Sequence, residues 1–214
     1  GNRGTMFFLS VLEHTIRIPP QTLNIRLEEA IFQELQKLFV DKIIKDLGLC
    51  VSIYDIRAID GGFVFAGDGA PTYTIDFRLV VFRPFIGEVL VGRLKKSDKS
   101  GIYLSLGFFD DIHVPEHHLQ QPSTFDEKEN AWKWDYDGSE LFLDLDEEVR
   151  FRVTQLKYPP IPLEQENDSK PFAPMEVIGD INGSGLGLVS WWADDGDEEA
   201  EEDGDKEVED DAND

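Results

Sequence analysis

The chain has 214 residues, enough for one large domain or two small ones, and its 15 Phe and 4 Trp supply the apolar bulk of folded cores. The formal net charge is −24, of which residues 193–214 contribute −13, because they hold 14 Asp and Glu and one Lys. The −11 left for residues 1–192 excludes a generally basic surface, so any contact with nucleic acid has to use a local cluster of Lys and Arg.

The single cysteine, Cys50, excludes an intramolecular disulfide and indicates a reducing compartment. It lies in the apolar run 47–53, so we interpret it as a small buried hydrophobe. No apolar stretch approaches the ~20 residues of a membrane span, and no signal-peptide pattern opens the chain. We therefore expect a soluble intracellular protein without membrane contact, and we expect residues 1–5 to be a leader or a cloning remnant.

Residues 6–83 predict a compact α+β domain that begins with a short apolar strand at 6–12. Behind Pro19 and Pro20, apolar residues recur every three or four positions, which predicts a helix with one buried stripe and with Thr22 as a plausible N-cap. The residues of this stripe are Leu23, Leu27, Ile31, Leu35 and Leu38.

Two further strands are predicted at 49–56 and 73–82, with a glycine-bracketed loop at 61–69 between them. On the second strand, Ile75, Phe77 and Leu79 share one face with Tyr73 and Val81. The opposite face is half apolar, so we expect it to be covered as well. Pro84 marks the boundary of this domain.

Residues 84–192 predict strands only, which favours a small barrel of the OB type. Strands at 87–95 and 102–108 flank a polar turn, and 148–156 alternates between apolar and polar residues. Strands at 175–181 and 186–192 are predicted to form a hairpin through Asn182-Gly183-Ser184-Gly185.

Two loop insertions are expected in this barrel, at 120–139 and at 158–174, the second with five prolines. Residues 193–214 hold almost no apolar side chain, so they are expected to form a disordered acidic tail.

Candidates for catalysis are weak. Asp110 and Asp111 are adjacent and point apart on extended backbone, so they do not focus on one metal or proton. His113 and His117 have the spacing of a helical metal pair, but Pro115 lies between them. Gly183, Gly185 and Gly187 precede an expected strand instead of the helix that a phosphate loop needs. We expect no catalytic residue, no metal and no cofactor.

Signals for binding are stronger. Four cations cluster on the first barrel hairpin beside Tyr103, and a positive charge beside an aromatic ring suits single-stranded nucleic acid. These cations are Arg93, Lys95, Lys96 and Lys99. Arg150 and Arg152 share one strand face and are candidates to extend the patch, although Asp146, Glu147 and Glu148 stand close enough to neutralise them. Phe108 and Phe109 point to opposite faces, so one is a candidate core residue and the other a candidate stacking platform.

Six motifs appear in an order that resembles a known family. They are Met6-Phe-Phe-Leu, Ile16-Arg-Ile-Pro-Pro, DGGFVFAGDGA at 60–70, VVFRPF at 80–85, LGFFDDI at 106–112 and GLGLVSWW at 185–192. Together they resemble the larger stalk subunits of the RNA polymerases, and the motifs at 106–112 and 185–192 favour the RNA polymerase III version. The resemblance spans residues 6–192.

The resemblance implies an RNP-like tip domain at 6–83 that docks to the polymerase core and an OB barrel at 84–192 that contacts nascent RNA. It also implies a smaller helical partner along both domains, a role in transcription initiation and a place in the nucleus. Two alternatives stay open: a free-standing OB-type RNA-binding or translation factor, and a metal-dependent enzyme that uses Asp110, Asp111 and the histidines.

Overall fold

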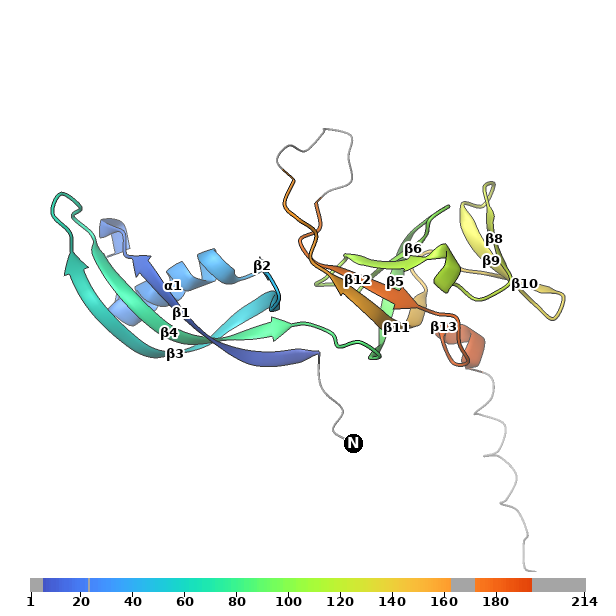
Figure 1. Cartoon of the computed structure of the whole chain (residues 1–214), viewed down its shortest axis with the longest axis horizontal. Coiled ribbons are helices and arrows are strands. Elements are labelled where there is room, and N and C mark those ends of the chain that lie inside the picture. Colours follow the sequence, from blue (N-terminus) through green and yellow to red (C-terminus); the bar gives the residue numbers. More distant parts are fainter. Residues whose placement is uncertain (1–5, 23, 163–171, 194–214) are drawn as a thin grey trace, which may run out of the picture.

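The computed structural model describes residues 6–22, 24–162 and 172–193, and these form an elongated molecule with a sheet and helix at one end and a barrel at the other (Figure 1). The expected leader at 1–5, residues 194–214 of the acidic tail expected at 193–214, and residues 163–171 of the second insertion lie outside the described residues. No helix in the described part is long and apolar enough to cross a membrane.

The N-terminal half is a four-stranded antiparallel sheet in the order β1-β4-β3-β2, with one α-helix packed on a face. Its elements are β1 (Phe7–Arg17), the 3-10 helix η1 (Pro20–Thr22), α1 (Leu27–Phe39), β2 (Ile43–Ile44), β3 (Gly48–Val64) and β4 (Pro71–Phe82). Ile75, Phe77 and Leu79 of β4 are fully buried in one cluster with Ile31 and Leu35 of α1. The α+β prediction for this half is confirmed.

Several boundaries differ from the prediction. The helix begins at Leu27 and its N-cap residue is Arg26, whereas Thr22 ends η1 and donates its hydroxyl to the Pro19 carbonyl oxygen at 2.8 Å. Thr22 is therefore not the N-cap. Leu27 and Leu38 are exposed, because the buried stripe of this short helix runs through Ala30, Ile31 and Leu35. Leu23 lies outside the described residues.

The predicted loop at 61–69 is shorter than expected, because β3 continues through Gly61 and Gly62 to Val64. Four register shifts against β4 absorb the extra residues of β3, and the last of them lies between Gly61 and Phe63. The second face of β4 is only partly covered: Phe82 is buried, whereas Asp76, Arg78 and Val80 keep intermediate exposure.

The C-terminal half is a closed five-stranded barrel, which confirms the OB-type prediction. Its strands are β5 (Val89–Asp98), β6 (Gly101–Ser105), β7 (Ile112–Pro115), β11 (Glu148–Lys157) and β12 (Glu176–Asp180). The sheet order β12-β7-β6-β5-β11 closes through a second pairing between β11 and β12, and β12 runs parallel to β7.

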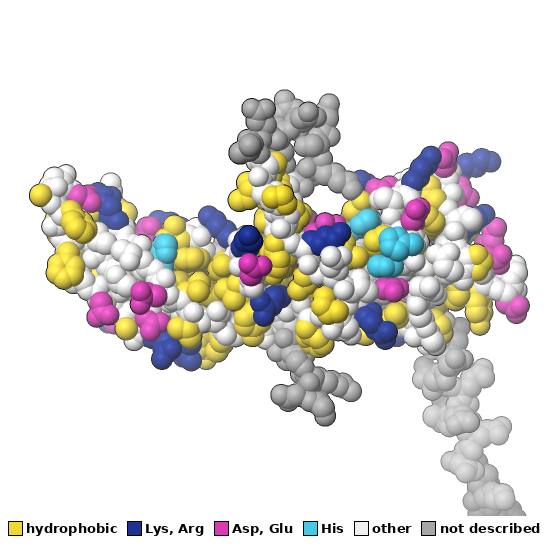
Figure 2. All heavy atoms as spheres, viewed as in Figure 1, with side chains coloured by type: hydrophobic (Ala, Val, Ile, Leu, Met, Phe, Trp, Pro, Cys, Tyr) yellow, Lys and Arg dark blue, Asp and Glu magenta, His cyan; other side chains and the backbone are white. Residues whose placement is uncertain are grey.

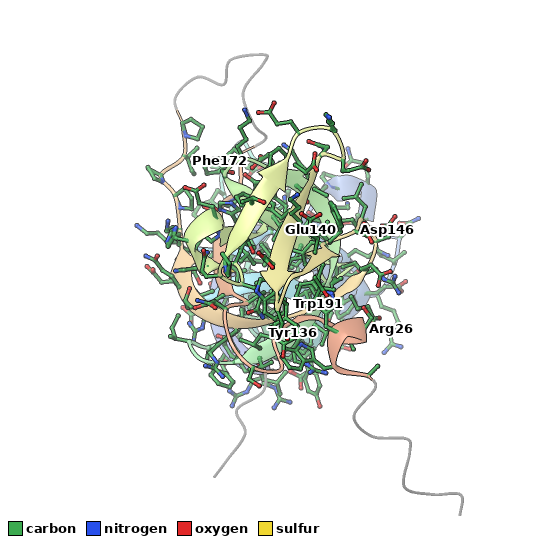
Figure 3. The ribbon with its side chains drawn as sticks, turned by 90° about the vertical axis from the view of Figure 1, so that its right-hand side faces the viewer. Arg26, Tyr136, Glu140, Asp146, Phe172 and Trp191 are labelled. Carbon is green, nitrogen blue, oxygen red and sulfur yellow. The ribbon has the colours of Figure 1, made fainter. Side chains whose placement is uncertain are left out.

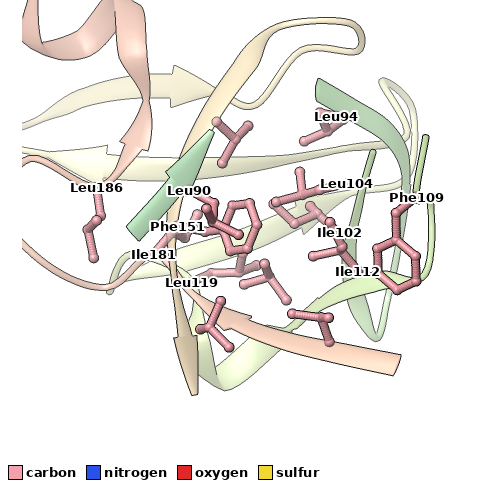
Figure 4. Packing of buried hydrophobic residues seen from close by; sticks show 14 of the residues in the cluster. Leu90, Leu94, Ile102, Leu104, Phe109, Ile112, Leu119, Phe151, Ile181 and Leu186 are labelled. Atoms are coloured by element: carbon pink, nitrogen blue, oxygen red, sulfur yellow. The ribbon is translucent and has the colours of Figure 1, made fainter. Parts of the chain in front are cut away.

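Phe151 lies at the centre of the barrel core, fully buried with Leu104 and Ile112 (Figure 4). Its ring needs a glycine on the neighbouring strand: a Cβ on Gly179 would stand 2.9 Å from the Phe151 ring and 3.2 Å from Val114. The alternation predicted at 148–156 is confirmed, because its apolar residues Val149, Phe151 and Val153 are all fully buried.

The first insertion is not a loop. It contains β8 (Ser123–Asp126), β9 (Ala131–Tyr136) and β10 (Ser139–Phe142), a three-stranded sheet at the far end of the barrel, and η2 (Glu116–His118) precedes it (Figure 1). Trp132 is only 6% exposed, belongs to the barrel core and donates its indole N–H to the Asp98 carbonyl oxygen at 2.8 Å. Burial of this indole ties the sheet to the barrel.

The predicted C-terminal hairpin is also wrong. β12 and β13 (Gly187–Leu188) both pair with β11 and not with each other, and the residues after β13 form the 3-10 helix η3 (Val189–Trp192). Gly187 has a φ of +96°, and a Cβ there would lie 2.6 Å from the Trp191 ring. This glycine turns the chain away from a strand path and lets Trp191 fold back.

The two halves share apolar core at their junction. Phe82 and Leu49, which belong to the N-terminal sheet, lie in the buried cluster of the barrel. The Phe82 ring centroid lies 5.7 Å from that of Phe7, 5.0 Å from Phe108 and 5.2 Å from Phe109. Packing of this kind fixes how the sheet and the barrel are joined.

Candidate nucleic-acid interface

The cations of the first hairpin lie on the outer surface of β5. A register shift between Leu94 and Lys96 interrupts the alternation of β5, so Lys95 and Lys96 are both exposed while Leu94 is fully buried. Arg93 is exposed as well, and Lys99 stands at the turn into β6. The structure therefore brings the four predicted cations onto one outer strip of the barrel.

Each hairpin cation already has a carboxylate within 4 Å. The closest N···O distances are 3.7 Å for Arg93 and Glu148, 3.3 Å for Lys95 and Asp146, 3.8 Å for Lys96 and Asp98, and 2.5 Å for Lys99 and Glu127. The hydrogen bond from Lys99 lowers the pKa of Glu127. Such exposed pairs contribute little to stability, so a phosphate can replace the carboxylate at small cost. Basic and acidic side chains alternate over the barrel in Figure 2 and form no continuous basic field on that face.

Tyr103 is the aromatic residue of this strip. The His113 ring stacks on it with centroids 4.6 Å apart and planes 15° from parallel, and the Lys96 ammonium lies 5.4 Å from its centroid. Because β6 lies between β5 and β7, these two neighbours flank Tyr103 from opposite sides. A base can stack on Tyr103 only after Lys96 moves away.

Arg150 and Arg152 lie on β11, directly opposite Val91 and Val89 of β5. The Arg150 guanidinium donates to the Gly185 carbonyl oxygen at 2.9 Å. Two of the acidic neighbours that were candidates to neutralise these arginines, Asp146 and Glu148, pair with Lys95 and Arg93. Asp180 of β12 is the register partner of Arg152, so a carboxylate residue stands directly across the strand pair from this arginine. Arg150 and Arg152 thus continue the cationic strip from β5 onto β11 with acidic residues beside them.

Phe108 lies apart from these residues. It is 47% exposed and contacts Phe7 at 5.6 Å between centroids, at the junction with the N-terminal sheet, whereas Phe109 is buried in the barrel core. The predicted division of this pair between core and surface is correct. The exposed ring, however, faces the junction and does not join the hairpin cations.

Two features of the barrel surface are not predicted from the sequence. A pocket of about 500 Å³ opens beside Lys96 and Tyr103, lined also by Asp111 and Phe172, and burial raises the pKa of the Asp111 carboxyl. At the end of the barrel, Trp134 contacts both Tyr136 and Trp191, two residues that Figure 3 labels. The alternation of aromatic residues at 132, 134 and 136 indicates a strand there. The sequence has no signal for the pocket, because residues far apart in the chain line it.

The candidate catalytic residues do not assemble. Asp110 accepts a hydrogen bond from the Ser105 hydroxyl, His113 stacks on Tyr103, and the His117 and His118 rings contact each other at 4.3 Å. In the part of the chain that is described, no three His, Cys, Asp or Glu side chains are grouped to hold a metal ion.

The fold joins a small α+β half to an OB-type barrel, and the barrel carries exposed cations beside an aromatic ring. Two family profiles match the chain: the SHS2 domain found in the N terminus of Rpb7p/Rpc25p/MJ0397, over residues 13–69, and RNA polymerase III subunit Rpc25, over residues 88–169.

Three RNA polymerase III subunits match over nearly their whole length. The chain is 41% identical over 201 residues to DNA-directed RNA polymerase III subunit RPC8 of Bos taurus, and the match covers 87% of this chain and 98% of that protein. It is 34% identical over 202 residues to the subunit of the same name from Schizosaccharomyces pombe, and the match covers 87% of this chain and all of that protein. The Saccharomyces cerevisiae subunit is 34% identical over 211 residues, with the same coverage. The chain belongs to the family of RNA polymerase III subunit RPC8.

Proposed function

We propose that this chain is a non-catalytic stalk subunit of a nuclear DNA-directed RNA polymerase III, which docks to the polymerase core with a smaller partner and supports initiation. The observation that carries the proposal is the end-to-end match to named polymerase III subunits, at 41% identity and 98% coverage of the bovine protein. A free-standing RNA-binding or translation factor is not favoured, because such a factor need not match a polymerase subunit over its full length.

We assign the core contact to the tip of the N-terminal domain, for which we propose the bounds 6–83. Phe63, Val64 and Phe65 stand at the end of β3 with 72%, 60% and 63% of their surface exposed. Three neighbouring apolar side chains in water are unusual for a free domain and typical of a protein–protein contact.

We assign the smaller partner to the apolar side chains along β1 and the junction. Leu9 and Val11 point outward from β1, and Phe108, Phe85 and Ile86 continue the apolar surface toward the barrel, for which we propose the bounds 84–192. The yellow surface near the middle of Figure 2 is consistent with a partner that bridges both domains.

We assign single-stranded nascent RNA to the cationic strip of the barrel. The strip combines the hairpin cations Arg93, Lys95, Lys96 and Lys99 with Arg150 and Arg152. Weak surface pairs leave the hairpin cations able to exchange a carboxylate for a phosphate, and Tyr103 becomes a stacking surface when Lys96 follows the phosphate.

The subunit assignment is tested by affinity purification of the tagged chain from its own cells. We expect polymerase III core subunits and a small helical protein in stoichiometric amounts. The F63S/F65S variant should lose the core and keep the small partner, whereas L9S/V11S should lose the small partner. Purification of the wild-type chain without any polymerase subunit would refute the assignment.

The RNA contact is tested with a labelled 20-nucleotide oligouridine over a salt series. The K95A/K96A/K99A variant should bind more weakly, and its slope of log affinity against log salt should fall by roughly 2, since each lost phosphate contact on a single strand removes ~0.7. The K37A/K42A/K45A variant removes the same charge from the N-terminal domain and should bind like the wild type. Equal slopes for both variants would place the RNA elsewhere.

A further inference from the structure

The pocket beside the cationic strip is a part of the barrel surface that the proposed phosphate contacts do not use. Its volume of about 500 Å³ lies in the usual range of small-molecule sites. One wall is apolar and comes from Phe172 and Pro159, and Tyr103 and His113 form another wall. These two rings are register partners on β6 and β7 and stack with centroids 4.6 Å apart. The pocket therefore offers a flat ring two kinds of wall, and Lys96 of the strip lies at its edge.

The polar side chains of the pocket include carboxylates from two neighbouring parallel strands. Val177 of β12 is the register partner of Ile112 of β7, and its N–H donates to the Asp111 carbonyl oxygen at 2.9 Å. Both Ile112 and Val177 belong to the barrel core, so the side chains that precede them, Asp111 and Glu176, point outward. Asp111 and Glu176 therefore present two carboxylates side by side to the pocket, at a fixed strand register.

These two carboxylates can accept hydrogen bonds from a ligand. Burial, and then the charges of Asp110 and Glu176, raise the pKa of Asp111, and no hydrogen bond from a described residue opposes this shift. The Glu176 carboxylate approaches the His113 ring at 4.0 Å between Oε1 and Nδ1, which is longer than a hydrogen bond. An ionised carboxylate has acceptors only, so a ligand that brings N–H donors offsets both the desolvation and the mutual repulsion of the pair.

The four RNA bases differ in the donors that they offer to such a pair. Guanine has two adjacent donors, N1–H and the N2 amino group, on its Watson–Crick edge. Adenine and cytosine place an amino group beside a bare ring nitrogen, and uracil places its N3–H between two carbonyl oxygens. Each of these three bases therefore turns an acceptor toward a carboxylate. Stacking walls accept any base, so the carboxylate pair is the part of the pocket that selects guanine.

We propose that this pocket binds one guanine of the single strand, whose N1–H and N2 amino groups donate to the Asp111 and Glu176 carboxylates while its phosphate lies beside Lys96. The base occupies the space between the Tyr103 and Phe172 walls. The proposal rests on the proposed RNA contact and adds its base preference. The cationic strip holds the backbone whatever the sequence, whereas the pocket recognises one base by its hydrogen-bonding edge.

The test compares labelled 20-nucleotide strands on the full wild-type chain at about 0.1 M salt. A strand of uridines with one central guanine should bind roughly 10-fold more tightly than oligouridine, as expected for a bidentate contact to one base. Inosine in place of the guanine lacks the N2 amino group and should lose most of this gain. Equal affinity for the guanine and uridine strands would overturn the proposal and leave the RNA contact intact. Absence of binding by every strand would refute the RNA contact itself.

The matched variants change the two carboxylates and keep the size of their side chains. In D111N/E176Q the ratio of the affinities for the guanine and uridine strands should fall below roughly 2-fold, because amide donors replace half of the acceptor oxygens. The E129Q/D135N variant removes the same two charges near the β8–β10 sheet and should keep the wild-type ratio. Using the ratio cancels the general effect of charge on RNA affinity. An unchanged ratio in D111N/E176Q would contradict the assignment of the carboxylates.

Competition with guanosine monophosphate separates a guanine in RNA from a free guanine nucleotide. The free nucleotide lacks the contacts of a longer backbone with the cationic strip, so it should displace the guanine strand only at concentrations far above the Kd of that strand. Displacement at concentrations near that Kd would show that the pocket serves a free nucleotide, and it would overturn the assignment to RNA.

Discussion

Phe82 is the residue through which the two halves of the chain depend on each other. It is fully buried, belongs to β4 of the N-terminal sheet, and yet lies in the core cluster of the barrel with ring contacts to Phe7, Phe108 and Phe109. The F82A variant removes this ring and leaves a cavity shared by both halves. Truncation of a buried Phe costs roughly 3–5 kcal/mol, of which part is the cavity itself.

Hydrogen exchange followed by mass spectrometry reads both halves in one experiment. A loss of 3–5 kcal/mol corresponds to opening that is roughly 10²- to 10⁴-fold more frequent, and we expect this acceleration in peptides of both α1 and β11. The L35A variant is the matched control, because Leu35 is equally buried but lies only in the cluster of the N-terminal domain. It should accelerate exchange in α1 far more than in β11.

The outcome that refutes this reasoning is acceleration confined to one half in F82A. The F82L variant guards against complete unfolding, since it keeps most of the apolar volume and should move both halves together by a smaller factor. The four Trp residues all lie in the barrel half, so Trp fluorescence reports on the unfolding of the barrel. The same coupling predicts that, in the wild type, this fluorescence change coincides with the unfolding of α1.

Three further predictions concern single sites. The G101A variant should lose more than ~1 kcal/mol of unfolding free energy, measured by urea unfolding, because Gly101 has a φ of +140° and a Cβ there would overlap the Val114 carbonyl oxygen. The G107A variant is the control and should lose less, because Gly107 has a φ of +90° but open space around the new Cβ. Burial raises the pKa of Cys50 to about 11, so its thiol should resist alkylation at pH 8. The unfolded thiol titrates near 9, so the stability that the neutral thiol contributes is complete below pH 9 and is lost between pH 9 and 11. The C50A variant should not show this loss of stability. Burial also raises the pKa of Asp111, so the folded state favours its neutral form and D111N should raise the melting temperature at pH 7 and not at pH 3; a lowered melting temperature at pH 7 would contradict the assignment.

The sequence predicted the parts of the fold that depend on local alternation and composition. Val149, Phe151 and Val153 alternate with polar residues, and all three are fully buried in the barrel. Ile75, Phe77 and Leu79 behave in the same way in β4. Period-2 patterns succeed because each side chain's burial is decided by the face of the strand on which it lies, and that face follows from position in the sequence. The candidate cations were found for a similar reason, since their clustering on one hairpin is a local property.

Tertiary structure decided which residues meet across long sequence distances. It placed a carboxylate beside each hairpin cation, enclosed Tyr103 between Lys96 and His113, and turned the expected loop at 120–139 into a sheet anchored by Trp132. It also paired β13 with β11 in place of the predicted hairpin. Strand pairing of this kind depends on the packing of the whole core and not on the few residues that a turn motif contains.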